Sequence, residues 1–413
     1  MSSNLVPVSI ESIHIGQPLP FALKDASGTL LAHKGFVFQS RDELLVLVRR
    51  GFSLYTDVAD SEAYQRAFVS KLHSLVREEK LLGQIAGVQI SRDDLDATPR
   101  LELVEGPTDW LDLQTQANAI LRDSSSPQFL NRIDRLQNLL RQHTQRNPDG
   151  ALFALFHLSA SELHLYSATH AMLVCVMCGL AVREVLNWPA GLEQTLCRAA
   201  LTMNISMTDL QDRLALQVEP PTPEQRQQID QHAARSVQLL EQAGLCDRPW
   251  LEAVRDHHSV APGALAAKSE GQRMARLIQR ADMFGARLAP RASRVPTSPA
   301  AAMQASYFDE NRQVDEAGAA LIKAVGIYSP GSFVRLSTNE VAVVIRRGAN
   351  TTTPRVAVVI NREGLPTVEP TIRDTSQREY RIVASVPHRD VKVQLHLQRM
   401  LALTAAPASD RVW

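Results

Sequence analysis

The chain has 413 residues, with 44 Lys and Arg against 44 Asp and Glu, and 45% of its residues are hydrophobic. This length allows two or three domains, each with its own core. The hydrophobic content excludes disorder for most of the chain. Because the formal net charge is +0, no overall field attracts a polyanion, and broad nucleic-acid binding is not expected.

The N-terminal segment MSSNLVPVSIESIHIGQ has no basic stretch followed by an apolar one, so we expect no signal peptide. The longest nearly uncharged apolar run covers residues 171–182, which is shorter than the roughly 20 residues of a membrane-spanning helix. The four cysteines fit a reducing compartment better than a disulfide framework; they are Cys175, Cys178, Cys197 and Cys246. We therefore predict a cytoplasmic protein with no membrane segment.

Residues 1–58 are predicted to form a small α+β module. Short β-like stretches flank a turn at residues 25–28. A helix follows, because Ser40 stands three residues before Glu43, as in a capping box, and Gly51 occupies the position of a C-terminal cap. Residues 59–147 are predicted to be a helical connector, with helices near 61–82, 109–122 and 128–145 and an irregular segment before residue 107.

Residues 148–330 are densely helical, with capping boxes at Thr222 with Gln225 and at Ser269 with Gln272. From residue 331 the hydrophobic period changes from 3.6 to 2, and SFVRLS, EVAVVIRR and PRVAVVIN read as three strands. A further strand, RIVASV, and a last helix near 390–403 complete the chain. The sequence thus predicts a mainly α protein, a helical bundle with a small N-terminal α+β module and a C-terminal antiparallel β segment at residues 331–413.

Five side chains of the metal-ligand type lie in the helical region: His170, His232, His257, His258 and Asp282. His170 lies in an almost wholly apolar helix, and His232 and Asp282 fall on or beside buried stripes at helical spacing. Taken singly, each histidine is more often a hydrogen-bonded core residue than a ligand. Together, imidazoles and a carboxylate that converge from separate helices are how a helical bundle builds a metal site.

The order of these residues resembles the HD-GYP branch of the HD-domain phosphohydrolases over about residues 150 to 350. The matching segments are YSATH, IDQHAARS, VRDHHSV, RLIQRADMF and the closing IYSPGSFVRLSTNEVAVVI. The resemblance implies an HD-domain-like helical bundle with two or three metal ions, commonly iron or manganese, that hydrolyses cyclic di-GMP. It also implies that the five side chains named above are the metal ligands. Residues 1–58 resemble, more weakly, the small domain that often precedes HD-GYP domains in bacteria.

Two motifs of this family are lost. Where the family has HDxGK, the chain has Met203-Asn204-Ile205-Ser206-Met207, and the loop after the paired histidines, SVAPGALAAKSEG, lacks the GYP letters. Two neighbouring divalent ions need carboxylates or a bridging anion to offset their repulsion. Asn204 offers only a neutral oxygen and Met203 a soft thioether. We therefore predict no catalytic residues, and either one divalent ion (Fe, Mn, Zn or Ni) or none.

Three arginines, Arg287, Arg291 and Arg294, follow Asp282 and are candidate phosphate contacts, with a solvated basic loop as the alternative. The leading hypothesis is a catalytically degenerate protein of bacterial cyclic di-GMP-type signalling, either a sensor of a cyclic dinucleotide or a scaffold for signalling-protein partners. The alternative is a metal-dependent phosphohydrolase or cyclic di-GMP phosphodiesterase with a single-ion site. A third hypothesis is a regulatory module related to the HDOD class.

Overall fold

The computed structural model describes most of the chain beyond residue 107 and a smaller part before it. The described residues are 5–7, 13, 15–16, 19, 21–25, 29–33, 36–40, 43, 54–57, 108–161, 165–260, 262–289, 297 and 299–405. The chain divides into two compact units, Met1–Arg100 and Leu101–Trp413, and each is described by itself.

The N-terminal unit contains a four-stranded antiparallel sheet in the order β1-β4-β2-β3. Its strands are β1 (Leu5–Pro7), β2 (Leu23–Lys24), β3 (Leu30–Ala32) and β4 (Tyr55–Asp57). The predicted cap is present, since the Glu43 amide donates to Ser40 Oγ at 3.3 Å and the Gln39 amide donates to the Glu43 carboxylate at 2.8 Å. The rest of the predicted helix, and the helix expected at 61–82, lie outside the described residues.

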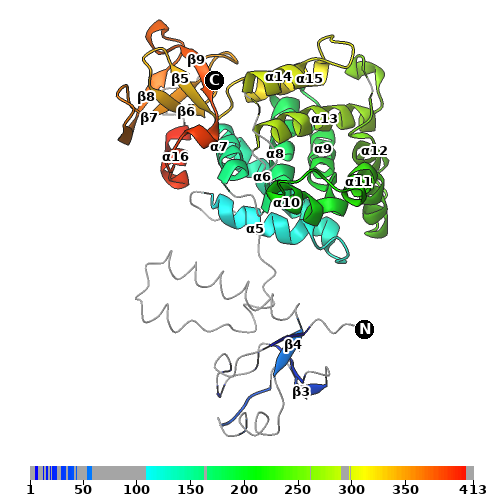
Figure 1. Ribbon diagram of the computed structural model, residues 1–413. Helices are drawn as coiled ribbons and strands as arrows, with labels where there is room; N and C mark the ends of the chain where they lie inside the picture. The colour runs from blue at the N-terminus through cyan, green and yellow to red at the C-terminus, as the bar shows by residue number, and fades with distance from the viewer. Residues whose placement is uncertain are drawn as a thin grey trace. The chain divides into compact units, whose positions relative to one another are not determined.

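The second unit is built mainly from helices (Figure 1). They are α5 (Trp110–Leu121), α6 (Phe129–Arg146), α7 (Pro148–Ser161), α8 (Tyr166–Ala181), α9 (Ala190–Thr202), α10 (Thr208–Leu216), α11 (Pro223–Gln242), α12 (Arg248–Asp256), α13 (Glu270–Leu288), α14 (Pro299–Tyr307) and α15 (Glu316–Val325). Shorter turns are the π-helical η3 (Val182–Leu186) and the 3-10 helices η4 (Ile205–Met207) and η5 (Leu265–Ala267).

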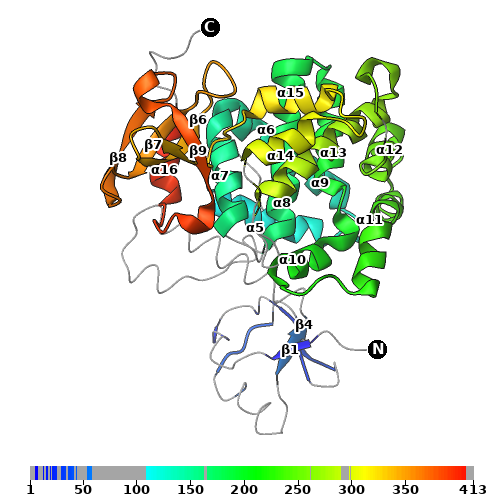
Figure 2. The ribbon, with the colours of Figure 1, turned by 45° about the horizontal axis from the view of Figure 1, so that its top comes forward.

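Helix α8 is the centre of this bundle. Each of its residues is buried, including Cys175 and Cys178, and it packs against α5, α7, α9, α13 and α15. Figure 2 shows α14 and α15 beside α13, and both pack against it, while α15 also packs against α8. By length and composition the continuous stretch Tyr166–Leu186 could cross a membrane, but most of it is buried inside the protein. An apolar helix with no polar face is expected at such a central position.

Both helix starts predicted from capping boxes are confirmed. The Thr222 and Ser269 hydroxyls accept from the amides of Gln225 and Gln272, and each Gln side chain accepts from the amide of its cap residue. Helices α5 and α6, which we had assigned to a connector, instead bury one face in the same core as α8. Their contribution includes Trp110, Leu113, Ile133, Leu136 and Leu140.

The C-terminal sheet has five antiparallel strands in the order β8-β7-β6-β5-β9. They are β5 (Phe333–Leu336), β6 (Val341–Arg346), β7 (Arg355–Ile360), β8 (Pro366–Asp374) and β9 (Ile382–Val386), followed by the 3-10 turn η7 (His388–Asp390) and α16 (Leu397–Thr404). Sequence analysis predicted the other four strands and missed β8, because Pro366 and Pro370 argue against a strand. An edge strand tolerates proline, since its outer amides need no partner.

The sheet is fixed to the helices by packing and by charge. Phe153 of α7 and Met400 of α16 share one buried cluster with β5, β6 and β7. At the end of β6, the Arg347 guanidinium donates to Asp149 of α7 and to Glu184 of η3, both at 2.7 Å. The β segment therefore belongs to the same compact unit as the bundle.

Candidate metal centre

Three of the five predicted ligands meet at one point. His232 lies on α11, whereas His257 and His258 directly follow α12. The ligand atoms of these three residues all lie within 4.8 Å of one another. His232 and His257 are buried and His258 is exposed, so the group is reached from solvent on the His258 side.

The orientation of two of these rings leaves the nitrogen that would bind a metal free. Nδ1 of His257 lies 2.7 Å from the carbonyl oxygen of Val254, and Nδ1 of His232 contacts the carbonyl oxygen of Ile229. A carbonyl only accepts, so each Nδ1 carries the proton and each Nε2 carries a lone pair. This is the arrangement of metal-bound histidines, in which a carbonyl fixes the tautomer.

The two Nε2 atoms lie 3.1 Å apart. With both protons on Nδ1, two lone pairs face each other across this distance, which is unfavourable unless a cation or a proton lies between them. Two nitrogen ligands of one tetrahedral zinc ion are themselves about 3.3 Å apart, given Zn–N bonds of about 2.0–2.1 Å. The spacing therefore suits two ligands of one ion.

Burial favours the neutral form of the His232 and His257 rings. Removal from solvent lowers the pKa of His257 to about 3, with the neighbouring His258 and His232 contributing, and burial also lowers the pKa of His232. A neutral imidazole is the form that binds a metal.

The remaining two predicted ligands form a pair of their own. His170 Nε2 donates to Asp282 Oδ1 at 2.7 Å, which joins α8 to α13, and the ring of Tyr166 stacks on His170 with centroids 5.5 Å apart. Burial raises the pKa of the Asp282 carboxyl, but the hydrogen bond from His170 and the nearby imidazoles of His258 and His257 bring the pKa well below its ordinary value. The carboxylate is thus ionised and is close enough to the three-histidine group to be influenced by it.

The segment that replaces HDxGK lies beside His232. The Ser206 hydroxyl donates to the carbonyl oxygen of His232 at 2.8 Å, and the Ser206 amide donates to Ser236 Oγ at 3.3 Å. Met203 is fully buried, and Asn204 is 7% exposed. The Asn204 side-chain oxygen is buried and has no hydrogen-bond partner among the described residues.

This donor set fits one ion better than two. The three converging imidazoles are ligands that zinc, iron, nickel or manganese accept, whereas the Asp282 carboxylate is paired with His170. A second ion would need another carboxylate to offset the repulsion between the cations. Residues 203–207 supply two thioethers, a neutral amide, a hydroxyl and a hydrocarbon side chain, so they do not meet that need.

Of the three arginines predicted to contact phosphate, one lies among the described residues. Arg287 is half-buried on α13, where its guanidinium donates to the carbonyl oxygen of Met283 on its own helix at 3.4 Å. Arg291 and Arg294 lie outside the described residues.

Sequence analysis made no prediction for three residues of α13 that are linked by hydrogen bonds to the turn after His258. Arg276 and Arg280, one turn apart on α13, are 2% exposed, and Gln279 lies between them in sequence. The available signal was the pair of arginines at i and i+4 within a helix that buries most of its residues, because fully buried guanidinium groups need carboxylate partners.

Comparisons with known proteins give a likeness to a solved structure. No protein-family model matches the chain, and no curated protein matches it. Among solved structures the chain is similar to Bd1817, an HDG"Y"P protein from Bdellovibrio bacteriovorus. The alignment covers 77% of this chain and 98% of that one, with 14% identity and a TM-score of 0.41.

Proposed function

We propose that this chain is a catalytically degenerate, HD-GYP-like signalling protein that holds a single divalent ion between His232, His257 and His258. In this role it either senses a cyclic dinucleotide or acts as a scaffold for a signalling partner. The proposal is supported first by the order of the motifs in the sequence. The three-histidine group supports it further, because it provides a place where an ion can bind.

The observation that carries the loss of catalysis is the chemistry of Met203 and Asn204. The two side chains are buried, in the segment whose Ser206 donates to the main-chain carbonyl of His232 on α11. The family that the sequence resembles has a histidine and an aspartate at these two positions. Neither side chain carries a charge, so this place offers no anionic bridge for a second ion. Phosphate ester hydrolysis by a two-metal centre depends on both ions to stabilise the attacking and leaving oxygens.

A single-ion phosphohydrolase is the second candidate. It is favoured by the three converging imidazoles, one of them on the exposed His258, because three protein ligands and an open position are the pattern of a mononuclear catalytic site. A single metal can activate water by itself. The two candidates differ in turnover and agree on metal content.

The experiment that separates them uses the full chain purified without chelator. We expect one tightly held ion per chain, as measured by elemental analysis, and no hydrolysis of cyclic di-GMP with added Mn²⁺, Fe²⁺ or Zn²⁺. His257→Ala should lose the ion. His143→Ala is the matched control, because His143 lies on α6, is hydrogen-bonded to Thr108 and is not one of the three residues of the group.

Metal-dependent turnover that disappears in His257→Ala would replace the signalling role with the hydrolase. Absence of metal from both the purified and the reconstituted chain would remove the ion from the proposal. Calorimetric titration with cyclic di-GMP then distinguishes the sensor from the scaffold, since only a sensor releases or absorbs heat that saturates at one ligand per site.

A further inference from the structure

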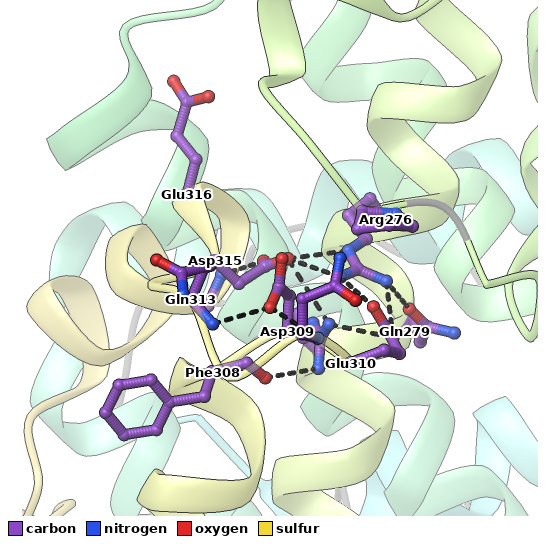
Figure 3. Close-up of polar contacts among 12 residues, drawn as sticks. Arg276, Gln279, Phe308, Asp309, Glu310, Gln313, Asp315 and Glu316 are labelled. Carbon is purple, nitrogen blue, oxygen red and sulfur yellow. Dashed lines mark hydrogen bonds and ion pairs between the residues drawn. The ribbon is translucent and has the colours of Figure 1, made fainter.

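Four buried or half-buried charges join α13 to the segment before α15 (Figure 3). The side chains of Arg276, Arg280 and Asp315 are 1%, 2% and 3% exposed, and that of Glu310 is 32% exposed. Arg276 donates from Nη1 and Nη2 to the two Glu310 oxygens at 2.9 Å and from Nε to Asp315 Oδ2 at 2.7 Å. Arg280 reaches the same two carboxylates at 3.2 and 3.3 Å.

The four groups form a neutral and closely fixed unit. Two guanidinium charges face two carboxylates, and the Arg276 contacts lower the pKa of Glu310 to about 2. Asp315 is fixed a second time, because its Oδ1 accepts from the amide of Gly318 at the start of α15. Buried charges paired in this way have one favourable arrangement, since any displacement leaves a charge without a partner.

Gln279 extends this unit toward the histidines. Its Oε1 accepts from Arg276 Nη1 at 2.7 Å, and its Nε2 donates to the carbonyl oxygen of Ser259 at 3.2 Å. A guanidinium only donates, so the amide oxygen of Gln279 must face Arg276, which directs the amide NH₂ to Ser259. The direction of the second bond is therefore set by the first.

Ser259 directly follows the His257–His258 pair. Its amide donates to the carbonyl oxygen of Asp256 at 2.8 Å, while its carbonyl is held by Gln279, so the turn that carries both histidines is fixed at its C-terminal end. The loop beyond it has another contact with the same region, where the Leu265 amide donates to the Glu316 carboxylate at 2.8 Å.

We propose that Gln279 is a positioning residue for the ion pocket: it couples the buried Arg276 to the turn that presents His257 and His258. This role rests on the single-ion pocket of the proposed function. Residues that orient metal ligands from outside the ligand set typically change metal affinity 10- to 100-fold when they are replaced.

Two substitutions of Gln279 distinguish a positioning role from an electrostatic effect on the ion. Gln279→Leu has a similar volume and removes both bonds. Gln279→Glu keeps an oxygen facing Arg276 but places a second acceptor against the Ser259 carbonyl. Because the added negative charge would by itself strengthen binding of a cation, weaker binding in both variants assigns the effect to the lost tether. Gln211→Leu on α10 is the matched control, since Gln211 is also 7% exposed.

The test measures Zn²⁺ affinity by competition with a chelating dye, the visible spectrum of the Co²⁺ form, and amide hydrogen exchange of residues 255–260 without metal. We expect both Gln279 variants to bind Zn²⁺ at least ten-fold more weakly, with an altered Co²⁺ spectrum and faster exchange, and Gln211→Leu to match the native chain. Native Zn²⁺ affinity in both Gln279 variants overturns the proposal, whatever the exchange rates show.

Failure of the pocket itself gives a different result. If the native chain binds no Zn²⁺ and His257→Ala changes nothing, the ion of the proposed function is wrong. Exchange in residues 255–260 then decides whether Gln279 orders the turn: unchanged rates in Gln279→Leu overturn that role as well, and faster rates in the two variants support it.

Discussion

The Nε2 atoms of His232 and His257 lie 3.1 Å apart, although neither nitrogen has a proton to share when both Nδ1 atoms donate to main-chain carbonyls. Helices α11 and α12 thus pack so that the Nε2 lone pairs of His232 and His257 face each other. A bound cation relieves this repulsion, because it replaces a lone-pair contact with two metal–nitrogen bonds. The chemistry of this pair is the strongest structural reason to expect an ion.

Restoring ligands at positions 203 and 204 should change the number of bound ions. In Met203→His/Asn204→Asp we expect two Mn²⁺ or Fe²⁺ ions per chain in place of one, because the new carboxylate offsets the repulsion between two cations. Metal content by elemental analysis after dialysis is the measurement. Met203→Leu fills the same buried space without a ligand and should keep one ion, and a stoichiometry of one in the double variant would contradict our view of this segment.

The charge unit around Asp315 should show a strong asymmetry. Asp315→Asn keeps an oxygen to accept from Gly318 but removes a carboxylate that is only 3% exposed, where water cannot take its place beside the two guanidinium groups. We therefore expect the free energy of unfolding to fall by about 3–5 kcal/mol. Glu310→Gln removes the more exposed carboxylate and should lower it by about 1 kcal/mol. Urea denaturation followed by circular dichroism measures both. Equal losses in the two variants would show that burial does not set the difference.

His388 should make the stability of the C-terminal sheet depend on pH. Its Nε2 donates to the Gly331 carbonyl at 3.1 Å, and burial lowers its pKa to about 4. The unfolded chain, with an ordinary pKa of about 6.5, binds the proton more readily, so this contribution is complete above pH 6.5 and is lost as the pH falls from 6.5 to 4.

The expected loss between pH 7 and pH 4.5 is about 1–2 kcal/mol more for the native chain than for His388→Gln, after allowance for partial solvent screening. Glutamine can donate the same hydrogen bond and does not titrate. The difference between the two proteins therefore removes the pH dependence that all other groups contribute. Parallel stability curves for the two proteins would show that His388 is not the source.

Gly318 permits a close approach between α14 and α15. A Cβ at this position would lie 1.9 Å from the carbonyl oxygen of Ser306, a main-chain atom that cannot move without displacing α14. We expect Gly318→Ala to lower the free energy of unfolding by about 1–3 kcal/mol. Gly191 of α9 has open space around it, and Gly191→Ala should be neutral or raise stability by up to about 1 kcal/mol. Thermal unfolding measures both variants. Similar changes in unfolding temperature for Gly318→Ala and Gly191→Ala would contradict this prediction.

Local features were well determined by the sequence. The capping residues Thr222 and Ser269 fixed two helix starts, because their hydrogen bonds involve neighbours only three residues away. The uninterrupted apolar character of residues 166–181 placed α8 in the core. The period-2 pattern identified four of the five C-terminal strands, whereas β8, with its two prolines, became a strand only because β7 offered a partner at the sheet edge.

The grouping of the candidate ligands depended on tertiary structure. The sequence determined which residues have metal-binding chemistry and that Met203 and Asn204 lack the charge of a two-metal site. Packing of α11 against α12 decided that His232 meets His257 and His258, while packing of α8 against α13 paired His170 with Asp282. The bond from Gln279 to Ser259 joins residues 20 positions apart, and no local pattern encodes such a contact, because it depends on how two helices and a turn fit around one buried arginine.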